Sequence, residues 1–561
     1  MRSTAFLSLL ASAATAAAAT IPSDEVPLIG PSFLSNFDPT NARAVLNATE
    51  SFPAIIDTLF ESDVLNKTDL VFTVDVFSAA TNKSLYSYFH AGDEGKQGLT
   101  AGVLNDQTIG RIGSVSKLFT VYAIIAKAGI EVFSHPVTKY LPELLGNSSG
   151  DPLKHVRWED ITVGALAAQQ AGSGGASNLL NKTTIEELAA ITPEDLFAYM
   201  RDNKRPVVSP FRNAVYSDSG FALLGQVLAR LSNQTYEDAV RDILANPLGL
   251  NSTTASVPKG TDVNAINRAL FTDVTSYGLD VPIVYPSGGI YSNAADLRTL
   301  GLSILNSELL SPATTSQWMK PLSGTGTLIE LVGAPWEITR LAIPATPGSN
   351  RTRISDLYIK AGGNGDYGCI FALSPDHGIG FSILVAGITS GAARWVIRDT
   401  IGELFIPAAE AAAAENAKQN IAGIFETPDG RNITLTIDDG HPGLGIESAS
   451  LESLAGGSMR LYPSGMYSSS RSLSALYNTK GTFRAALRGI MYGVPFPARA
   501  ASEGGTGGLF DNQYSWMDIG FVDGEDEFIL TIEDGKAMSV EAAIGGEQMT
   551  FERVESQLFT H

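Results

Sequence analysis

The sequence predicts a two-lobed α/β (α+β) domain followed by a separate all-β domain. Strand-like segments occur at both ends of the first 400 residues, helical patterns fill the stretch between them, and the pattern changes again after residue 420. The chain has 561 residues, which is too long for one compact core, so two or more domains are expected. Apolar residues make up 44% and charged residues 17% of the chain, as is typical of globular proteins.

The elements of the first domain follow from the spacing of its apolar residues. LVFTVDVFSAATNKSLYSYFHAG (70–92) alternates apolar and polar residues around a TNK turn and predicts a β-hairpin. Helical patterns dominate from about 114 to 250, and a Gly/Ser-rich stretch follows. Strands are predicted again at 356–362, 367–375 and 377–387, and a helix is predicted after them to about 405. Strands that flank helices in this way are expected to form one unit rather than two sequential domains.

The C-terminal part has a different character. PAAEAAAAENAKQN (407–420) is Ala-rich and predicts a helical linker. Beyond it, short alternating runs separated by Gly or Asp-Gly turns predict an antiparallel sandwich or barrel. The expected organisation is a signal peptide over 1–20, a loop-rich lead segment over 21–69, the two-lobed domain over 70–405, the linker over 406–420 and the β domain over 421–561.

The N-terminus and the sequons predict export. MRSTAFLSLLASAATAAAAT has an early Arg, a short apolar run and then small residues, which is the pattern of a signal peptide cleaved near Ala19 or Thr20. The mature protein is therefore expected to be secreted and soluble, with no membrane contact. Nine N-x-S/T sequons agree with this and are the expected glycosylation sites: Asn47, Asn66, Asn82, Asn147, Asn181, Asn233, Asn251, Asn350 and Asn432.

Charge and composition exclude several classes of partner and cofactor. The formal net charge of −21 argues against nucleic acid or an anionic membrane as a partner. Cys369 is the only cysteine and lies in the apolar run GCIFAL, so a buried small side chain is expected rather than a nucleophile. The six histidines form no H-E-x-x-H or H-x-H cluster, and no metal or other cofactor is expected. No G-x-S-x-G, Walker or dinucleotide-binding motif is present in a suitable context.

A possible nucleophile and base stand three residues apart in RIGSVSKLFT (111–120). A Ser at a helix start lies where backbone N–H groups favour negative charge, and a Lys three residues later projects from the same face. Ser114 and Lys117 therefore fit a nucleophile with its base. The pattern is common by chance, since Ser256 and Lys259 match it too, although no apolar helix follows that second copy.

Two further elements could move protons or bind substrate. Tyr216 and Asp218 lie in NAVYSDSGFALLG, just before a predicted helix, and Tyr291 in PSGGIYSNAADL is a rival match. Lys360 begins Lys-Ala-Gly on a predicted strand, whereas its rival Lys127 reads as ordinary helix end-capping. The loop QAGSGGAS (170–177) is expected to be mobile, and a role in lining the cleft is a lesser hypothesis.

Taken together and in order, these motifs resemble the serine β-lactamase and penicillin-binding-protein superfamily, especially its class C-like and esterase-like branch. Within it, the chain looks like a fungal-type secreted β-lactamase-like protein with an extra C-terminal β domain. The S-x-x-K box is IGSVSKLFT, the Tyr box and its following helix lie in SPFRNAVYSDSGFALLGQVLARLSNQTYEDAVRDILANPLGL, and KAGGNGDYGCIFALSPDHGIGFSIL resembles the K-T-G strand. PSGGIYSNAADLRTL matches a further landmark, which accounts for Tyr291. The resemblance implies a central antiparallel sheet with a helical lobe.

The resemblance also implies a role for each matching residue. Ser114 would be the acylated nucleophile, with Lys117 and Tyr216 as its proton relay; which of the two removes the Ser proton is left open. The backbone N–H groups of Ser114 and Gly363 would form the oxyanion hole. The residues expected to bind substrate are Asp218, Lys360, Ala361 and Gly362.

Two departures from the family pattern bear on the substrate. Asp218 stands where the family usually has Asn, so an amide that can donate becomes a carboxylate that accepts and that could pair with Lys117 or attract a substrate amine. Ala361 replaces the hydroxyl residue of K-T-G, which removes a donor to a β-lactam carboxylate. The expected function is a serine hydrolase acting on a small-molecule acyl substrate, an ester or amide rather than a β-lactam. An acyltransferase with the same acyl-enzyme and a non-turnover binding or sensor protein are the alternatives, and the oligomeric state is left open.

Overall fold

A computed structural model describes most of the chain. The described residues are 29–146, 150–175, 182, 184–259, 263–344, 352–437, 442–447, 458–468, 481–492, 526–544 and 546–554. The predicted signal peptide and the sequons at Asn147, Asn181 and Asn350 lie outside them. No helix within these ranges is long and apolar enough to cross a membrane.

An eight-stranded antiparallel sheet forms the centre of the first domain, in the order β2-β1-β10-β9-β8-β7-β6-β5. Its strands are β1 (Val71–Ser78), β2 (Lys83–Ala91), β5 (Ser323–Gly324), β6 (Glu330–Val332), β7 (Glu337–Pro344), β8 (Thr352–Asn364), β9 (Tyr367–Ser374) and β10 (Ile379–Ala386). The expected hairpin over 70–92 and the three strands after residue 355 are confirmed. The N-terminal β1 pairs with β10 from the far end of the domain, from Val71 opposite Ala386 to Ser78 opposite Ile379. This pairing joins both ends of the domain in one sheet, as the flanking strand pattern predicts.

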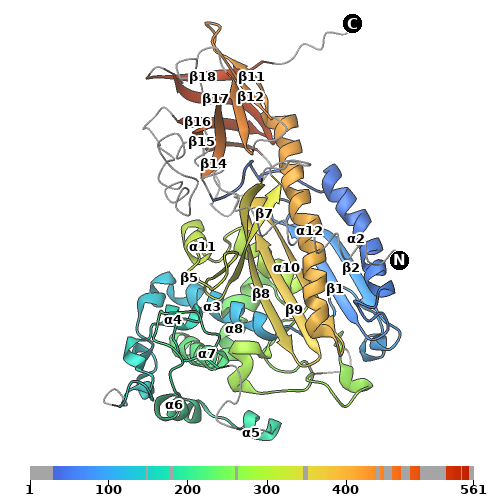
Figure 1. The fold of residues 1–561 in the computed structure, drawn as a ribbon, viewed down its shortest axis with the longest axis vertical. Coiled ribbons are helices and arrows are strands. Elements are labelled where there is room, and N and C mark those ends of the chain that lie inside the picture. The colour runs from blue at the N-terminus through green and yellow to red at the C-terminus, as the bar shows by residue number, and fades with distance from the viewer. Residues whose placement is uncertain are drawn as a thin grey trace, which may run out of the picture.

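Helices cover both faces of this sheet (Figure 1). On one face, α2 (Arg43–Glu61) and the long α12 (Ser390–Asn416) lie side by side and share a core with β1, β8, β9 and β10. On the other face, α10 (Ala294–Leu305) leads into a helical lobe whose core contains α3 (Ser116–Ala128) and α7 (Asp218–Ser232). β9 and β10 are buried on both faces, which explains their nearly continuous apolar sequence.

The prediction that the lead segment is loop-rich is wrong. This segment contains the 19-residue helix α2. Its buried residues are spaced three or four apart along most of one face: Val45, Ala48, Phe52, Ile56 and Phe60. That is the apolar spacing of an amphipathic helix, so the signal is present in the sequence. Pro53 lies inside the helix, and α2 is covered by the neighbouring α12 and the sheet.

A buried polar network ties β8 to α12. The Arg353 guanidinium donates to both carboxylate oxygens of Glu410, at 2.9 and 2.7 Å, and to Asp376 at 2.9 Å. His377 lies 2.8 Å from Glu410 through Nε2 and 2.7 Å from Ser374 through Nδ1. Burial opposes the charge of Glu410, but Arg353 and His377 outweigh it and lower its pKa to about 2. The network therefore joins strand, turn and helix through satisfied charges.

The C-terminal domain is a closed barrel, which decides between the sandwich and barrel predicted from the sequence. Its strands follow chain order and close through pairing of β11 with β18. They are β11 (Gly423–Glu426), β12 (Asn432–Thr436), β13 (Leu444–Glu447), β14 (Ser458–Ser468), β15 (Thr482–Tyr492), β16 (Glu527–Glu533), β17 (Lys536–Ile544) and β18 (Glu547–Arg553). The expected linker is helical, as the end of α12 and the short π-helix Ala417–Ile421 that follows it. Its Ala413, Ala414 and Ala417 join the barrel core together with Phe33 and Leu34.

Candidate active site

Ser114 lies in a tight turn, Gly113–Val115, directly before α3, and Lys117 is in the first turn of that helix. Ser116 holds this turn in place, since its hydroxyl donates to Gly113 O at 2.7 Å and accepts from Ile290 N at 3.0 Å. The Lys117 ammonium nitrogen lies 3.0 Å from Ser114 Oγ. The three-residue spacing thus brings the two side chains into hydrogen-bond contact, as one helical turn requires.

The Lys117 side chain is fully buried, and three oxygens surround its nitrogen. Besides Ser114 Oγ, it donates to Asp218 Oδ1 at 2.5 Å and to the Ser287 carbonyl at 2.5 Å. An ammonium group has three N–H donors, so each acceptor takes one. Lys117 is therefore arranged as a charged donor toward Ser114.

Two glycines, Gly113 and Gly362, let the backbone of β8 approach the turn that holds Ser114. A Cβ on Gly113 would come within 2.4 Å of Gly363 N, and Gly113 has a φ of +52°. A Cβ on Gly362 would come within 1.9 Å of Ile112 O and 2.9 Å of Ser114 N. These contacts exclude any larger residue. The backbone nitrogens of Ser114 and Gly363, predicted to form the oxyanion hole, therefore both lie where β8 packs against the turn before α3.

Tyr216 lies beside both lysines. The Lys117 and Lys360 nitrogens are 4.8 and 5.4 Å from the centre of its ring. Its backbone carbonyl accepts from Gly175 N at 3.0 Å, so the predicted loop over 170–177 packs against this segment where it is described. The tyrosine is 40% exposed, and among the described residues its hydroxyl has no hydrogen-bond partner.

Lys360 is buried and pairs with Glu337, the first residue of β7. The Glu337 carboxylate accepts from the Lys360 ammonium and, at 2.9 Å, from the backbone N–H of Ala361. Burial alone would lower the pKa of Lys360, but the charge and hydrogen bond of Glu337 raise it above the ordinary value. Lys360 is accordingly held as a cation next to Tyr216.

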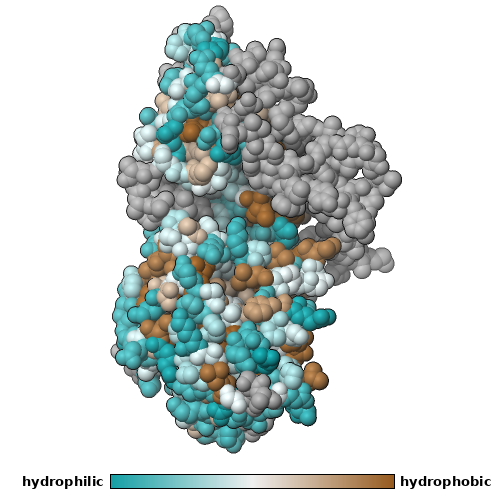
Figure 2. All heavy atoms as spheres, turned by 90° about the vertical axis from the view of Figure 1, so that its left-hand side faces the viewer, coloured by the Kyte–Doolittle hydropathy of each residue, from teal (hydrophilic) through white to brown (hydrophobic). Residues whose placement is uncertain are grey.

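These groups open onto a cavity of about 510 Å³. Ser114, Tyr216 and Lys360 line it from one side, and Arg394 and Trp395 of α12 line it from another. The β5–β6 hairpin closes a further side with Thr325, Glu330, Leu331 and Val332. Exposed apolar side chains extend this hairpin and the segment before it, namely Leu322, Leu328 and Ile329. Figure 2 shows the face that lies on the left-hand side of Figure 1. On this face, hydrophobic residues gather across the middle of the surface, below the barrel.

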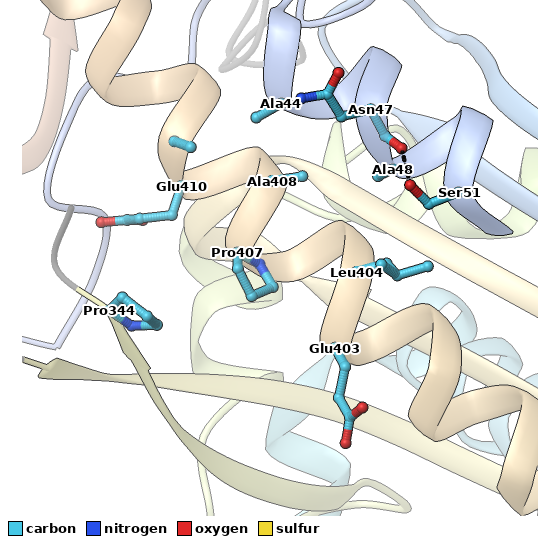
Figure 3. A pocket seen from close by; sticks show the side chains of 11 residues that line it. Ala44, Asn47, Ala48, Ser51, Pro344, Glu403, Leu404, Pro407, Ala408 and Glu410 are labelled. Atoms are coloured by element: carbon cyan, nitrogen blue, oxygen red, sulfur yellow. Dashed lines mark hydrogen bonds between the residues drawn. The ribbon is translucent and has the colours of Figure 1, made fainter. Parts of the chain in front are cut away.

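A second cavity, of about 370 Å³, lies between α2 and α12 (Figure 3). Pro407 faces Ala44 and Asn47 across it, and the Ser51 hydroxyl donates to the Asn47 carbonyl at 2.7 Å. Among its lining residues no basic side chain is present that could activate Ser51. The cavity at Ser114 is therefore the candidate active site.

The rival motifs lie elsewhere. Ser256 Oγ donates to Glu237 at 2.5 Å, and Tyr291 is fully buried against Arg111. Lys127 is in the last turn of α3, before Gly129. Cys369 is buried, and burial raises the pKa of its thiol, as expected for a packing residue. Within the described ranges no group of His, Cys, Asp or Glu could hold a metal ion.

Three residues at the site escape the sequence patterns. Ser287 contributes only its carbonyl, and Glu337 and Arg394 belong to no motif. Arg394 donates to the Gly362 carbonyl, and its guanidinium carbon lies 4.9 Å from the centre of the Trp395 ring. Only the fold brings these segments to β8, although PSGGIYSNAADLRTL, which contains Ser287, is a family landmark.

Two family models match the chain. Residues 80–396 match the Beta-lactamase model, and residues 413–553 match a model described as Beta-lactamase-like-like, C-terminal domain. The first match covers the helical lobe, the candidate active site and every strand of the sheet except β1, and the second covers the barrel.

Curated relatives carry similar descriptions. A "Beta-lactamase-like protein" of Arthroderma benhamiae is 30% identical over 362 residues, which are 59% of this chain and 57% of that protein. A "Probable hydrolase M10" of Phoma sp. is 25% identical, with 72% of this chain and 70% of that one covered. Among solved structures, a D-stereospecific amidohydrolase from Streptomyces sp. superimposes with a TM-score of 0.47 at 18% identity, covering 63% of this chain and 98% of that one.

Proposed function

The chain belongs to the beta-lactamase family, whose model covers more than half of its length, and on that premise we propose that it is a serine hydrolase that forms an acyl-enzyme on Ser114. The observation that carries the proposal is the contact of 3.0 Å between Lys117 Nζ and Ser114 Oγ at the wall of a cavity. A serine hydroxyl so placed has a cation at its oxygen and open space for a carbonyl carbon in front of it.

Tyr216 is the group we assign as proton acceptor. Lys117 Nζ contacts three oxygens, Ser114 Oγ, Asp218 Oδ1 and the Ser287 carbonyl, and we assign to it the role of stabilising negative charge on Ser114. The Tyr216 ring lies within 4.8 and 5.4 Å of two ammonium nitrogens, and its hydroxyl is otherwise unengaged among the described residues. Tyr216 lines the same cavity as Ser114, and we assign the proton transfer to its hydroxyl.

The proposed reaction has two steps. Ser114 Oγ bonds to the acyl carbon while the bond from that carbon to the leaving oxygen breaks, and the serine proton passes through Tyr216 to the leaving alcohol. The carbonyl oxygen carries negative charge in between, and the backbone N–H groups of Ser114 and Gly363 are the donors we assign to it. Water then attacks the acyl-enzyme by the reverse proton route and releases the acid.

Esters and amides without a carboxylate near the carbonyl are the proposed substrates. Ala361 has no hydroxyl for such a group, and Asp218 is bound to Lys117. The apolar lining from Leu331 and Val332 favours an apolar acyl chain. These features together support neutral acyl donors over β-lactams.

Labelling and turnover test the proposal together. A fluorophosphonate probe should add once to the wild-type protein, at Ser114, and not to Ser114→Ala, and p-nitrophenyl butyrate should be hydrolysed steadily by the wild type only. Ser256→Ala is the matched control and should keep labelling and turnover. Labelling without turnover would support a sensor, and turnover only with an added alcohol would support an acyltransferase. Full activity of Ser114→Ala would refute the acyl-enzyme assignment.

Export and glycosylation are also proposed. The sequon asparagines Asn47, Asn66, Asn82, Asn233 and Asn251 are exposed, as glycan addition requires. Treatment of the secreted protein with an N-glycosidase should lower its mass, and an unchanged mass would refute the glycosylation proposal.

A further inference from the structure

Glu337 occupies an anion-binding position inside the candidate active site. Its carboxylate accepts from the Lys360 ammonium and from the Ala361 backbone N–H, the second at 2.9 Å. A buried ammonium group beside a peptide N–H is the arrangement that holds a carboxylate. Here the chain itself supplies that carboxylate, from a side chain that lines the cavity and is 40% exposed.

Glu337 also balances the charge of the cavity wall. Burial lowers the pKa of Arg394, and the charge of Glu337 acts on that pKa in the opposite direction, as it does on the pKa of Lys360. Among the described residues, Glu337 is the only carboxylate paired with Lys360, and Arg394 has no ion pair. One carboxylate therefore faces two cations.

The other cations near the nucleophile are matched as well. Asp218 neutralises Lys117 at 2.5 Å, and Asp399 lies 2.6 Å from Arg398 at the cavity rim. An anionic substrate group therefore finds no unpaired lysine beside Ser114, and the cavity cation without an ion pair among the described residues, Arg394, already donates to the Gly362 carbonyl. The substrate group would have to displace Glu337, which is tethered at high effective concentration, or lie against its negative charge.

We propose that Glu337 is a specificity-determining residue that fills, with the chain's own carboxylate, the place of a substrate anion, and so restricts the site to acyl donors that are neutral near the carbonyl. The inference rests on the proposed acyl-enzyme function and explains why the substrates proposed there carry no negative charge near the carbonyl. Glu337 excludes negatively charged substrate groups. Its removal should therefore change the ratio of kcat/KM between charged and neutral substrates more than the kcat for the neutral substrate.

The test compares two esters that share a four-carbon acyl chain and a leaving group. They are p-nitrophenyl butyrate, which is neutral, and the mono-p-nitrophenyl ester of succinic acid, which is anionic. The wild type should prefer butyrate in kcat/KM. Glu337→Gln keeps an oxygen for Lys360 and Ala361 but loses the charge, and the ratio of succinate to butyrate kcat/KM should rise at least about tenfold, mainly through the KM of the succinate ester.

Glu330→Gln is the matched control, because Glu330 lines the same cavity and has no ion pair among the described residues. Its ratio should rise less than that of Glu337→Gln. An equal rise of the ratio in both variants would mean that only the net charge of the cavity matters, and it would overturn the role of Glu337. An unchanged ratio in Glu337→Gln would overturn that role as well. Free acetate gives a second readout, since it should inhibit butyrate turnover by Glu337→Gln more strongly than turnover by the wild type.

The two proposals fail in different ways. If the wild type hydrolyses neither ester, the proposed hydrolase function has failed. If it hydrolyses both and prefers the succinate ester, the hydrolase stands and the role of Glu337 is refuted, even if Glu337→Gln does not fold.

Discussion

The ammonium nitrogen of Lys117 lies 2.5 Å from Asp218 Oδ1, although the two residues are 101 positions apart in the chain. The lysine side chain is fully buried, while that of Asp218 is 26% exposed. Asp218 starts α7, and Lys117 lies in the first turn of α3, so the ion pair joins the starts of two packed helices. Placement of the lysine beside Ser114 thus depends on Asp218, the residue that stands where the resemblance leads us to expect Asn.

Replacing Asp218 with Asn tests this ion pair. Asp218→Asn keeps an oxygen for Lys117 but removes the charge, and solvent at the exposed part of the side chain offsets some of the loss. The free energy of unfolding should fall by about 1–2 kcal/mol in urea denaturation. The added amide donor should raise nitrocefin hydrolysis. Asp238→Asn, at a surface pair with Arg241, is the control and should change neither; an Asp218→Asn protein without increased nitrocefin hydrolysis would contradict the explanation given for that departure.

Loss of Lys117 should be far more damaging than loss of a surface lysine. Lys117→Met removes the cation at Ser114 Oγ and should lower kcat for p-nitrophenyl butyrate by about 10³-fold. Lys127→Met, at the other end of the same helix, should retain activity within about twofold. Steady-state kinetics on both variants check this, with circular dichroism to show that each is folded. Equal losses in the two proteins would argue against a direct role for Lys117.

A single methyl group on Gly362 should open the site. Gly362→Ala would place Cβ 1.9 Å from Ile112 O, so β8 and the nucleophile turn must separate. We expect a loss of about 2–3 kcal/mol in unfolding free energy, together with most of the ester turnover. Gly402→Ala in α12, where a Cβ meets nothing within 4 Å, should instead stabilise the protein by about 0.5–1 kcal/mol. Normal activity of Gly362→Ala would show that the close contact is not needed.

The Glu410 network predicts a pH dependence of stability. Although burial opposes its charge, Arg353 and His377 lower the pKa of Glu410 from 4.5 to about 2 in the folded protein. A carboxyl group with a lowered folded pKa adds stability that is fully present above its unfolded pKa and is lost as the pH falls through the folded value. Glu410→Gln should therefore be less stable than the wild type by about 3 kcal/mol at pH 7.

The difference between the two proteins should shrink as the pH falls from about 4.5 towards 2. Urea denaturation at a series of pH values measures it. A difference that stays constant over this range would exclude the ionised carboxylate as its source. His377→Gln is a useful companion variant, since it removes one of the two groups that lower the Glu410 pKa and should show a smaller effect of the same sign.

Much of the fold could be predicted from local pattern. The hairpin over 70–92 and the strands after residue 355 have strong alternation or continuous apolar runs, and they form β1, β2, β8, β9 and β10 in the structure. The short edge strand β5 and its neighbour β6 carry almost no pattern, because strands of two or three residues bury little. Helix α2 has a clear apolar period but stands in a polar lead segment, which obscured it.

The site divides in the same way. Ser114 and Lys117 are fixed relative to each other by one helical turn, so the sequence alone determines that they can touch. Glu337, Ser287 and Arg394 meet them only because β7, the turn before Ile290 and α12 converge on β8. Contacts between distant segments depend on sheet order and strand register, which a single sequence does not specify. The sequence thus determined the contact between Ser114 and Lys117, and the tertiary structure decided which charges surround it.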